Sequence, residues 1–246
     1  SVGSKTSNGS ESTGVIPFMK VVDAEMLAFS QGVTRRGSYA AYLDISHPEI
    51  EEFLDVRKPT GGDINRKSTN LHHGVVISDN FMQIIENATR TPGFDDSWDL
   101  IDPHSNNVIK TVSAKALWVK LIQNRVETGE PYIMFGDTVD ESVPEYQKEL
   151  GLKVRQSNLC SEITLPTDKD RTAVCCLSSV NLEEYDEWKD NDQFIPDLIR
   201  MLDNVLEYFI NYAPDQLHRA KYSASQERSL GLGAMGFHAY LQRHNI

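Results

Sequence analysis

The chain has 246 residues, 39% of them hydrophobic, which is enough for one large core or two smaller ones. Its 24 basic and 36 acidic side chains give a net charge of −12, which argues against a broad basic surface for nucleic acid. Three cysteines do not make a secreted disulfide framework, so we expect free thiols in a cytoplasmic protein. No apolar run reaches the roughly 18–20 residues of a membrane helix, so no membrane segment is predicted.

Along the chain, helical periodicity alternates with short apolar runs. Residues 1–14 are rich in Ser, Gly and Thr, so they predict a loop. The pattern predicts helices over 16–29, 47–54, 113–129 and 194–212, and strands over 39–45, 74–78, 132–135, 159–165 and 173–177. This alternation favours an α/β architecture with a parallel or mostly parallel sheet.

An amide, a thiol and a carboxylate follow one another at every second position: Asn158, Cys160 and Glu162. On an extended backbone the three side chains point to one face, because strand side chains alternate. Such polar groups must face water or form a site, since burying each one unpaired costs roughly 1–3 kcal/mol. The competing interpretation is an ordinary strand edge that carries an incidental cysteine.

The other two cysteines, Cys175 and Cys176, are adjacent, so on a strand their side chains point to opposite faces. Burial is the simplest interpretation of either thiol alone. One of them becomes a candidate for chemistry if it faces Cys160.

Three further patterns carry weaker signals. Arg35 and Arg36 lie in a loop with two glycines, which suits either a phosphate or a solvated turn. Residues 231–236 match G-x-G-x-x-G but lack the acidic residue of a dinucleotide site, so we expect close helix packing through small residues. His72 and His73 would diverge on a strand and the other histidines lack ligand spacing, so no metal site is expected.

A family resemblance is carried by residues 155–163 (Arg-Gln-Ser-Asn-Leu-Cys-Ser-Glu-Ile), followed by 165–167 (Leu-Pro-Thr) and 173–182 (Ala-Val-Cys-Cys-Leu-Ser-Ser-Val-Asn-Leu). This stretch resembles the active-site region of the large, catalytic subunit of class I ribonucleotide reductases. Residues 128–132 and 230–233 also fit, so the resemblance covers essentially the whole chain. It implies an α/β fold that is part of the family's ten-stranded α/β barrel, truncated at both ends.

The resemblance implies a thiyl-radical mechanism that reduces ribonucleoside diphosphates to deoxyribonucleoside diphosphates for DNA synthesis. Cys160, at the tip of a loop inside the barrel, would abstract the substrate's 3′-hydrogen. Glu162 would take the 3′-hydroxyl proton, for which a carboxylate is a suitable general base. Asn158 would orient the ribose, and Ser157 is assigned to substrate binding. Cys175 would be one of two thiols that reduce the 2′-position, with Cys176 a bystander.

Two loops resemble the family's effector machinery. The loop that relays effector identity to the substrate is matched by Ser30, Gln31, Gly32, Arg35 and Arg36. The end of the preceding effector loop is matched by Gly3 and Ser4. The resemblance therefore implies allosteric control by dNTP and ATP effectors.

The resemblance also implies partners. No cofactor would be bound directly, because a separate metal-containing small subunit generates the radical. A thioredoxin or glutaredoxin type reductant, the N- and C-terminal parts of the catalytic subunit and a second copy in a homodimer are the other expected partners, with no nucleic acid and no membrane.

We interpret residues 1–246 as a single partial catalytic barrel domain in which 1–14 are a flexible effector-loop remnant, and we expect the isolated chain to be inactive. The alternative is a non-catalytic nucleotide-binding or assembly remnant of the same family. A glycyl-radical relative is disfavoured, because Asn-Leu-Cys-x-Glu followed by a reducing cysteine fits the diphosphate reductases better.

Overall fold

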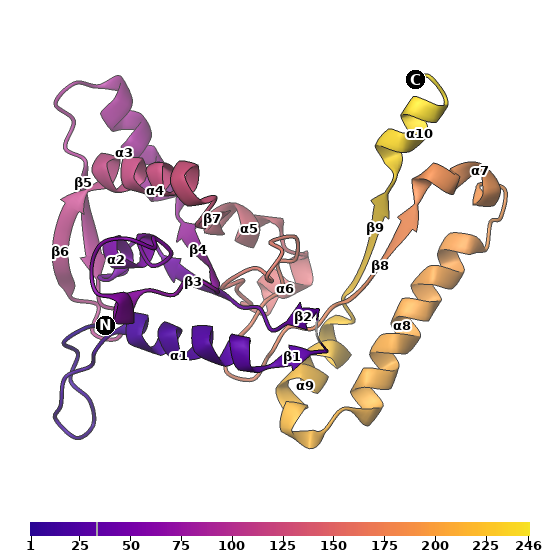
Figure 1. Ribbon diagram of the computed structural model, residues 1–246, viewed down its shortest axis with the longest axis horizontal. Helices are drawn as coiled ribbons and strands as arrows, with labels where there is room; N and C mark the ends of the chain where they lie inside the picture. Colours follow the sequence, from indigo (N-terminus) through magenta and orange to yellow (C-terminus); the bar gives the residue numbers. More distant parts are fainter. Residues whose placement is uncertain (33) are drawn as a thin grey trace. The chain divides into compact units, whose positions relative to one another are not determined.

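The computed structural model describes residues 1–32 and 34–246, and its contacts gather into two compact units, Ser1–Leu165 and Pro166–Ile246 (Figure 1). The first unit contains, in chain order, α1 (Val15–Ala28), β1 (Ser30–Gln31), β2 (Arg35–Arg36), β3 (Ala40–Asp44), α2 (Ile50–Leu54), η1 (Ile64–Arg66), β4 (His72–Ile77), α3 (Asp79–Arg90), β5 (Ser97–Ile101), β6 (Val108–Ser113), α4 (Ala114–Thr128), β7 (Tyr132–Phe135), α5 (Gly136–Ser142) and α6 (Glu145–Glu149). Whether the two units complete one barrel domain stays a prediction.

The centre of the first unit is a parallel sheet in the order β3-β4-β7. Its central strand, β4, is the most buried, which explains its nearly continuous apolar run. One face packs against the helices in a core formed by Ile45, Phe53, Leu54, Leu71, Val75, Ile77, Phe81, Leu117 and Leu121 with their neighbours. The parallel sheet and its helices confirm the predicted α/β class.

The opposite face of this sheet carries aromatic and polar side chains. Tyr42, Gly74 and Tyr132 are paired across the three strands, so all three lie on that face. His72 lies two residues before Gly74 and therefore shares it, whereas His73 is buried on the core side. The two histidines diverge as predicted.

The first unit departs from the predicted elements in several places, among them the unpredicted helix α3. The predicted helix at 47–54 begins only at Ile50, because residues 47–49 form a turn in which the Ile50 N–H donates to the His47 carbonyl. The hairpin β5–β6 was not predicted. Trp98 and Leu100 are buried and alternate with the exposed Ser97 and Asp99, which is the period-2 pattern of a half-buried strand.

The second unit contains β8 (Cys176–Asn181), η2 (Leu182–Glu184), α7 (Tyr185–Trp188), α8 (Phe194–Tyr212), η3 (Asp215–Leu217), α9 (His218–Glu227), β9 (Leu230–Met235) and α10 (Phe237–Arg243). Its two strands are parallel. Helix α8 has the predicted bounds, and its buried side reaches Leu202 and Leu206.

Two predictions for this unit are wrong. The strand predicted over 173–177 begins at Cys176, because residues 166–175 run without strand pairing. The glycine run 231–236 forms β9 and its end, so it does not serve helix packing. A Cβ on Gly231 would come close to the end of the Leu177 side chain on the paired strand, which would have to move aside.

Candidate active site

The segment around Cys160 is a loop, so the strand predicted over 159–165 is wrong. The Asn158 side-chain oxygen accepts hydrogen bonds from the backbone N–H groups of Glu162, at 3.1 Å, and Ile163, at 3.0 Å. The Ser161 N–H also donates to the Asn158 carbonyl at 3.1 Å. Asn and Asp favour such side-chain-closed turns over strand pairing. The turn, and not a shared strand face, therefore gathers the polar residues.

Two further features hold the loop closed. The Ser157 hydroxyl donates to the Ile163 carbonyl at 2.7 Å, and Ser157 is buried. Ser161 has a φ of +66°, a left-handed conformation that reverses the chain directly after Cys160. Cys160 thus lies at the tip of the loop, as the resemblance implied, and both Cys160 and Glu162 are exposed.

The stem of the loop is tied to α5 by one carboxylate. Asp140 accepts from the Val154 N–H at 3.1 Å and pairs with Lys153 at 2.9 Å. The loop therefore leaves a defined point of the first unit. A thiol on such a stem has its position set by backbone bonds and not by packing around the sulfur.

The chemistry available at this tip is a thiol, a carboxylate and an amide within five residues. The Asn158 oxygen is used by the turn, and its amide nitrogen takes no part in those bonds, which leaves a donor for a ligand hydroxyl. Since the Ser157 hydroxyl donates within the loop, it holds the turn shut. Its contact with a substrate stays a prediction.

Cys175 lies in the second unit, at the end of the segment that precedes β8. The Cys175 thiol is 3.7 Å from the Cys176 carbonyl, and the Cys176 N–H donates to the Ser229 carbonyl at 3.3 Å. Burial raises the pKa of the Cys176 thiol. A raised pKa lowers the fraction of the Cys176 thiol that is present as thiolate. The bystander role of Cys176 stays a prediction.

The segment before Cys175 is fastened by a buried ion pair. Arg171 pairs with Glu227 of α9 at 2.8 Å, and their side chains are 9% and 4% exposed. The Arg171 guanidinium also lies 5.1 Å from the centre of the Tyr222 ring. These contacts join the irregular segment to α9.

The first of the two predicted effector loops contains a small ladder of two short strands. Ser30 pairs with Arg36 and Gln31 with Arg35 in the small antiparallel ladder β1–β2, and Gly32 has a φ of +73°. Both arginines are exposed, which suits an anionic ligand. Val33, inside this loop, lies outside the described residues.

Residues 1–14 contain no helix, but backbone bonds cross them. Gly3 donates to Ser12 at 2.9 Å, and Ser12 donates to Ser4 at 2.8 Å. The buried Glu49 carboxylate then accepts from the Val15 N–H at 3.0 Å, where α1 begins. The predicted flexibility of this loop stays a prediction.

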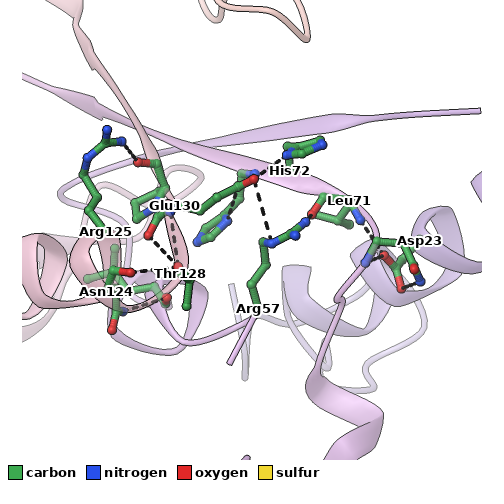
Figure 2. A network of polar contacts seen from close by, with 12 residues as sticks. Asp23, Arg57, Leu71, His72, Asn124, Arg125, Thr128 and Glu130 are labelled. Carbon is green, nitrogen blue, oxygen red and sulfur yellow. Dashed lines mark hydrogen bonds and ion pairs between the residues drawn. The ribbon is translucent and has the colours of Figure 1, made fainter. Parts of the chain in front are cut away.

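One buried cluster was not predicted. The carboxylate of Glu130, two residues before the start of β7, contacts the His72 and His73 rings and the His73 N–H (Figure 2). Burial alone would raise the pKa of Glu130, but hydrogen bonds from His73 and His72, with Arg57 nearby, outweigh it and lower the pKa to about 2. In the sequence, the only sign of this cluster was the adjacent pair His72 and His73 next to an apolar run.

Other kinds of site have no counterpart in residues 1–32 and 34–246. No group of three or more His, Cys, Asp or Glu side chains there is arranged to hold a metal ion. No helix of the described chain is long and apolar enough to span a membrane.

Comparisons with known proteins place the chain in a family. The model of the ribonucleotide reductase barrel domain matches residues 1–246. A putative ribonucleoside-diphosphate reductase large subunit of Frog virus 3 is 53% identical over 96% of this chain and 41% of its own length. The large subunit of Invertebrate iridescent virus 3 is 47% identical over 94% of this chain and 44% of its own length.

A solved structure agrees with the sequence relatives. The class Id ribonucleotide reductase alpha subunit of Actinobacillus ureae aligns with a TM-score of 0.76 and 34% identity, over 96% of this chain and 39% of that one. The chain therefore spans about two fifths of the length of these relatives.

Proposed function

We propose that this chain, which belongs to the ribonucleotide reductase barrel-domain family, supplies the radical-bearing loop and one reducing thiol of a ribonucleoside-diphosphate reductase. The observation that carries the proposal is the Asn158-closed turn, which presents Cys160 at its tip with Glu162 two residues away. A thiol for hydrogen abstraction and a carboxylate for proton removal are the two groups that the first step needs.

In the proposed reaction the Cys160 thiyl takes the 3′-hydrogen atom of the substrate, which leaves a carbon radical and a closed-shell thiol. Glu162 accepts the 3′-hydroxyl proton, and the 2′-hydroxyl leaves as water with a proton from one of two reducing thiols. Cys175 and the second thiol supply two electrons and their other proton to the 2′-position and become a disulfide, and Glu162 returns its proton to the 3′-oxygen. The 3′-hydrogen then returns from Cys160, which regenerates the thiyl.

The remaining roles of this chain concern positioning. The Asn158 amide nitrogen donates to a ribose hydroxyl, and the exposed Arg35 and Arg36 bind the negative charge of a nucleotide. We assign the loop residues Ser30, Gln31 and Gly32, together with Gly3 and Ser4, to the response to dNTP and ATP effectors. A separate metal-containing subunit supplies the radical when it is bound.

The whole reaction also requires polypeptide beyond this chain. The second reducing thiol, a thioredoxin or glutaredoxin type reductant and the remaining parts of the large subunit are the proposed partners. Pairing with a second copy of the chain belongs to the same proposal.

The test is reconstitution. The chain is mixed with polypeptides that supply the rest of the large subunit, the radical-generating subunit and a dithiol reductant, and formation of deoxyribonucleoside diphosphate is followed. Conversion that requires this chain supports the proposal. A complex that is assembled, as shown by sedimentation, but forms no product would favour the non-catalytic remnant.

A further inference from the structure

The Glu49 side chain, which is 6% exposed, bonds to two backbone N–H groups that lie on either side of the N-terminal loop. Oε2 accepts from the Val2 N–H at 3.1 Å, and Oε1 accepts from the Val15 N–H at 3.0 Å. A buried carboxylate is stabilised only where donors replace the water that it has lost. Glu49 therefore holds the backbone at Val2 and the backbone at Val15 on one side chain.

The chain between these two points is a narrow hairpin of residues 3–12. The Gly3 N–H donates to the Ser12 carbonyl at 2.9 Å, and Lys5 and Glu11 form a single antiparallel bridge beyond it. The hairpin extends away from the start of α1 (Figure 1). Its two ends are therefore gathered at the same buried carboxylate.

Gly14 allows the carboxylate to approach the backbone this closely. It has a φ of +87°, which glycine adopts without strain. A Cβ at this position would lie 2.0 Å from Glu49 Oε1 and 2.4 Å from the Val2 side chain. The carboxylate could move aside only by giving up its bonds to Val2 and Val15, so the glycine at position 14 matches the acid at position 49.

The backbone of Glu49 is fixed by the turn that precedes α2. The Glu49 N–H donates to His47 Nδ1 at 3.1 Å, and the Ile50 N–H donates to the His47 carbonyl at 3.0 Å. His47 is buried, and burial lowers its pKa, so the ring is neutral at physiological pH and Nδ1 can accept. Backbone and side-chain bonds of this turn therefore set where the carboxylate lies.

Helix α1 connects this point to the other predicted effector loop. The Val15 N–H is the first of α1, and Gly14 before it provides no side-chain cap, so the Glu49 carboxylate takes the place of a cap at the positive end of the helix. Directly after α1, the Gly37 N–H donates to the Phe29 carbonyl at 2.8 Å and closes the loop between them. Both predicted effector loops are therefore attached to the ends of one helix, which begins at Glu49.

We propose that Glu49 is a positioning residue for the effector response: its buried carboxylate clamps both ends of the 3–12 hairpin and the start of α1, so that the hairpin is presented to a nucleotide in one arrangement. The clamp follows from the contacts of this chain, whereas its importance for effector binding rests on the proposed function. The two parts are therefore tested separately.

Limited digestion of the folded chain with trypsin tests the clamp without effector or turnover. Lys5 lies in the hairpin, and a protease cuts a segment that has opened locally, so the rate of cleavage after Lys5 reports the opening of the hairpin. Lys169 of the second unit, whose side chain is 89% exposed, provides an internal reference. Mass spectrometry follows both cleavages in one sample.

The variants are Glu49→Gln, Gly14→Ala and the double variant. Glu130→Gln is the matched control, because Glu130 is also 6% exposed and also accepts from a backbone N–H, that of His73 at 3.0 Å on β4. It removes a buried charge of the same unit and leaves the hairpin bonds in place.

A glutamine at position 49 has one accepting oxygen, so one of the two N–H groups loses its partner. We expect Glu49→Gln to speed cleavage after Lys5 relative to Lys169 by about tenfold or more, the scale of one lost hydrogen bond to a charged group. Gly14→Ala should speed it similarly, and the double variant should be no faster than the faster single one, since both open the same clamp. Glu130→Gln should lower the melting temperature and leave the ratio unchanged.

The clamp is overturned if Glu49→Gln leaves the cleavage ratio unchanged, or if the effects of Glu49→Gln and Gly14→Ala multiply in the double variant. It is equally overturned if Glu130→Gln changes the ratio as much, because the effect would then reflect general loosening. Should Glu49→Gln fail to fold, Gly14→Ala replaces it, with the same expected increase and the same contrary result.

Equilibrium binding of dTTP to the reconstituted large subunit, measured by ultrafiltration, tests the role in the effector response. Glu49→Gln should raise the Kd about threefold or more, because the nucleotide must then order a hairpin that is partly open, and Glu130→Gln should not. An unchanged Kd beside faster cleavage would overturn this role. Failure of the unchanged enzyme to bind dTTP would contradict the proposed function and leave the cleavage results standing.

Discussion

Cys160 lies at the tip of a loop that is closed by a neutral side chain, Asn158, whereas Cys175 ends a segment that is tied to its unit by the buried ion pair of Arg171 and Glu227. The bonds to Asn158 replace bonds to water and are cheap to break and remake. A buried ion pair loses far more when one partner is removed. The difference indicates that the Cys160 loop is held by weaker interactions than the Cys175 segment.

The sharpest test of this contrast is Arg171→Met, which removes the charge from the buried pair and keeps an apolar stem. We expect the second unit to lose about 3–5 kcal/mol in the free energy of unfolding, since Glu227 would lose its buried guanidinium. Urea titration followed by tryptophan fluorescence measures the loss. Arg200→Met is the matched control, because the Arg200–Asp197 pair is 65% and 61% exposed and should contribute less than about 1 kcal/mol.

A second prediction concerns the charge of Glu130, which the neutral Asn158 lacks. The pKa of Glu130 is lowered to about 2 from the ordinary 4.5, so its contribution is fully present above pH 4.5 and is lost as the pH falls towards 2. We expect the destabilisation caused by Glu130→Gln to shrink by about 2 kcal/mol between pH 7 and pH 3. Urea titrations of both proteins at the two pH values measure it. A destabilisation that is the same at both pH values would contradict the lowered pKa.

A smaller effect on stability, with a larger one on activity, is expected for Asn158→Ala. The change removes the acceptor of two backbone N–H groups at an exposed loop, which costs about 1 kcal/mol. A displaced thiol nevertheless lowers turnover of the reconstituted enzyme on the order of 100-fold. Asn158→Asp keeps the accepting oxygen and loses the amide donor, so its stability should match that of the unchanged chain while its KM rises. Equal activity of the Ala variant and the unchanged chain would show that the turn does not position Cys160.

The smallest effect is expected for Gly231→Ala on β9. The new Cβ overlaps only the end of the exposed Leu177 side chain, which can move, and lies 3.7 Å from the Cys175 sulfur. We expect a loss below about 1 kcal/mol and slower iodoacetamide labelling of Cys175 relative to Cys176. Labelling and urea titration of one preparation give both numbers. A large loss of stability would mean that β9 packs more tightly on β8 than the side chains indicate.

The sequence predicted those helices and strands in which the buried residues recur at one regular spacing. Helices α4 and α8 have long runs of apolar residues at helical spacing, and their bounds agree with the prediction to within a residue. Strand β7 was found in the same way, as a short apolar run between turn residues. In these places local pattern and tertiary packing agree.

The predictions were wrong where the backbone conformation depends on a side-chain hydrogen bond or on a strand that is distant in the sequence. The spacing of Asn158, Cys160 and Glu162 is that of a strand, but the Asn158 side chain satisfies the N–H groups that a ladder would need. The glycines of β9 suggested helix packing because the residues paired with them, in β8, are 54 positions earlier in the chain. No prediction was made for Glu130, since its donors come from the distant strand β4.

The central claim is that Cys160 carries the radical, and the most direct measurement is nucleoside-diphosphate reduction by the reconstituted enzyme with Cys160→Ser compared with Cys176→Ser. Both variants replace one sulfur by one oxygen, so a difference between them reports on position. The account predicts that Cys160→Ser abolishes reduction and that Cys176→Ser retains it, with both proteins folded by circular dichroism. Reduction that persists with Cys160→Ser would contradict the account.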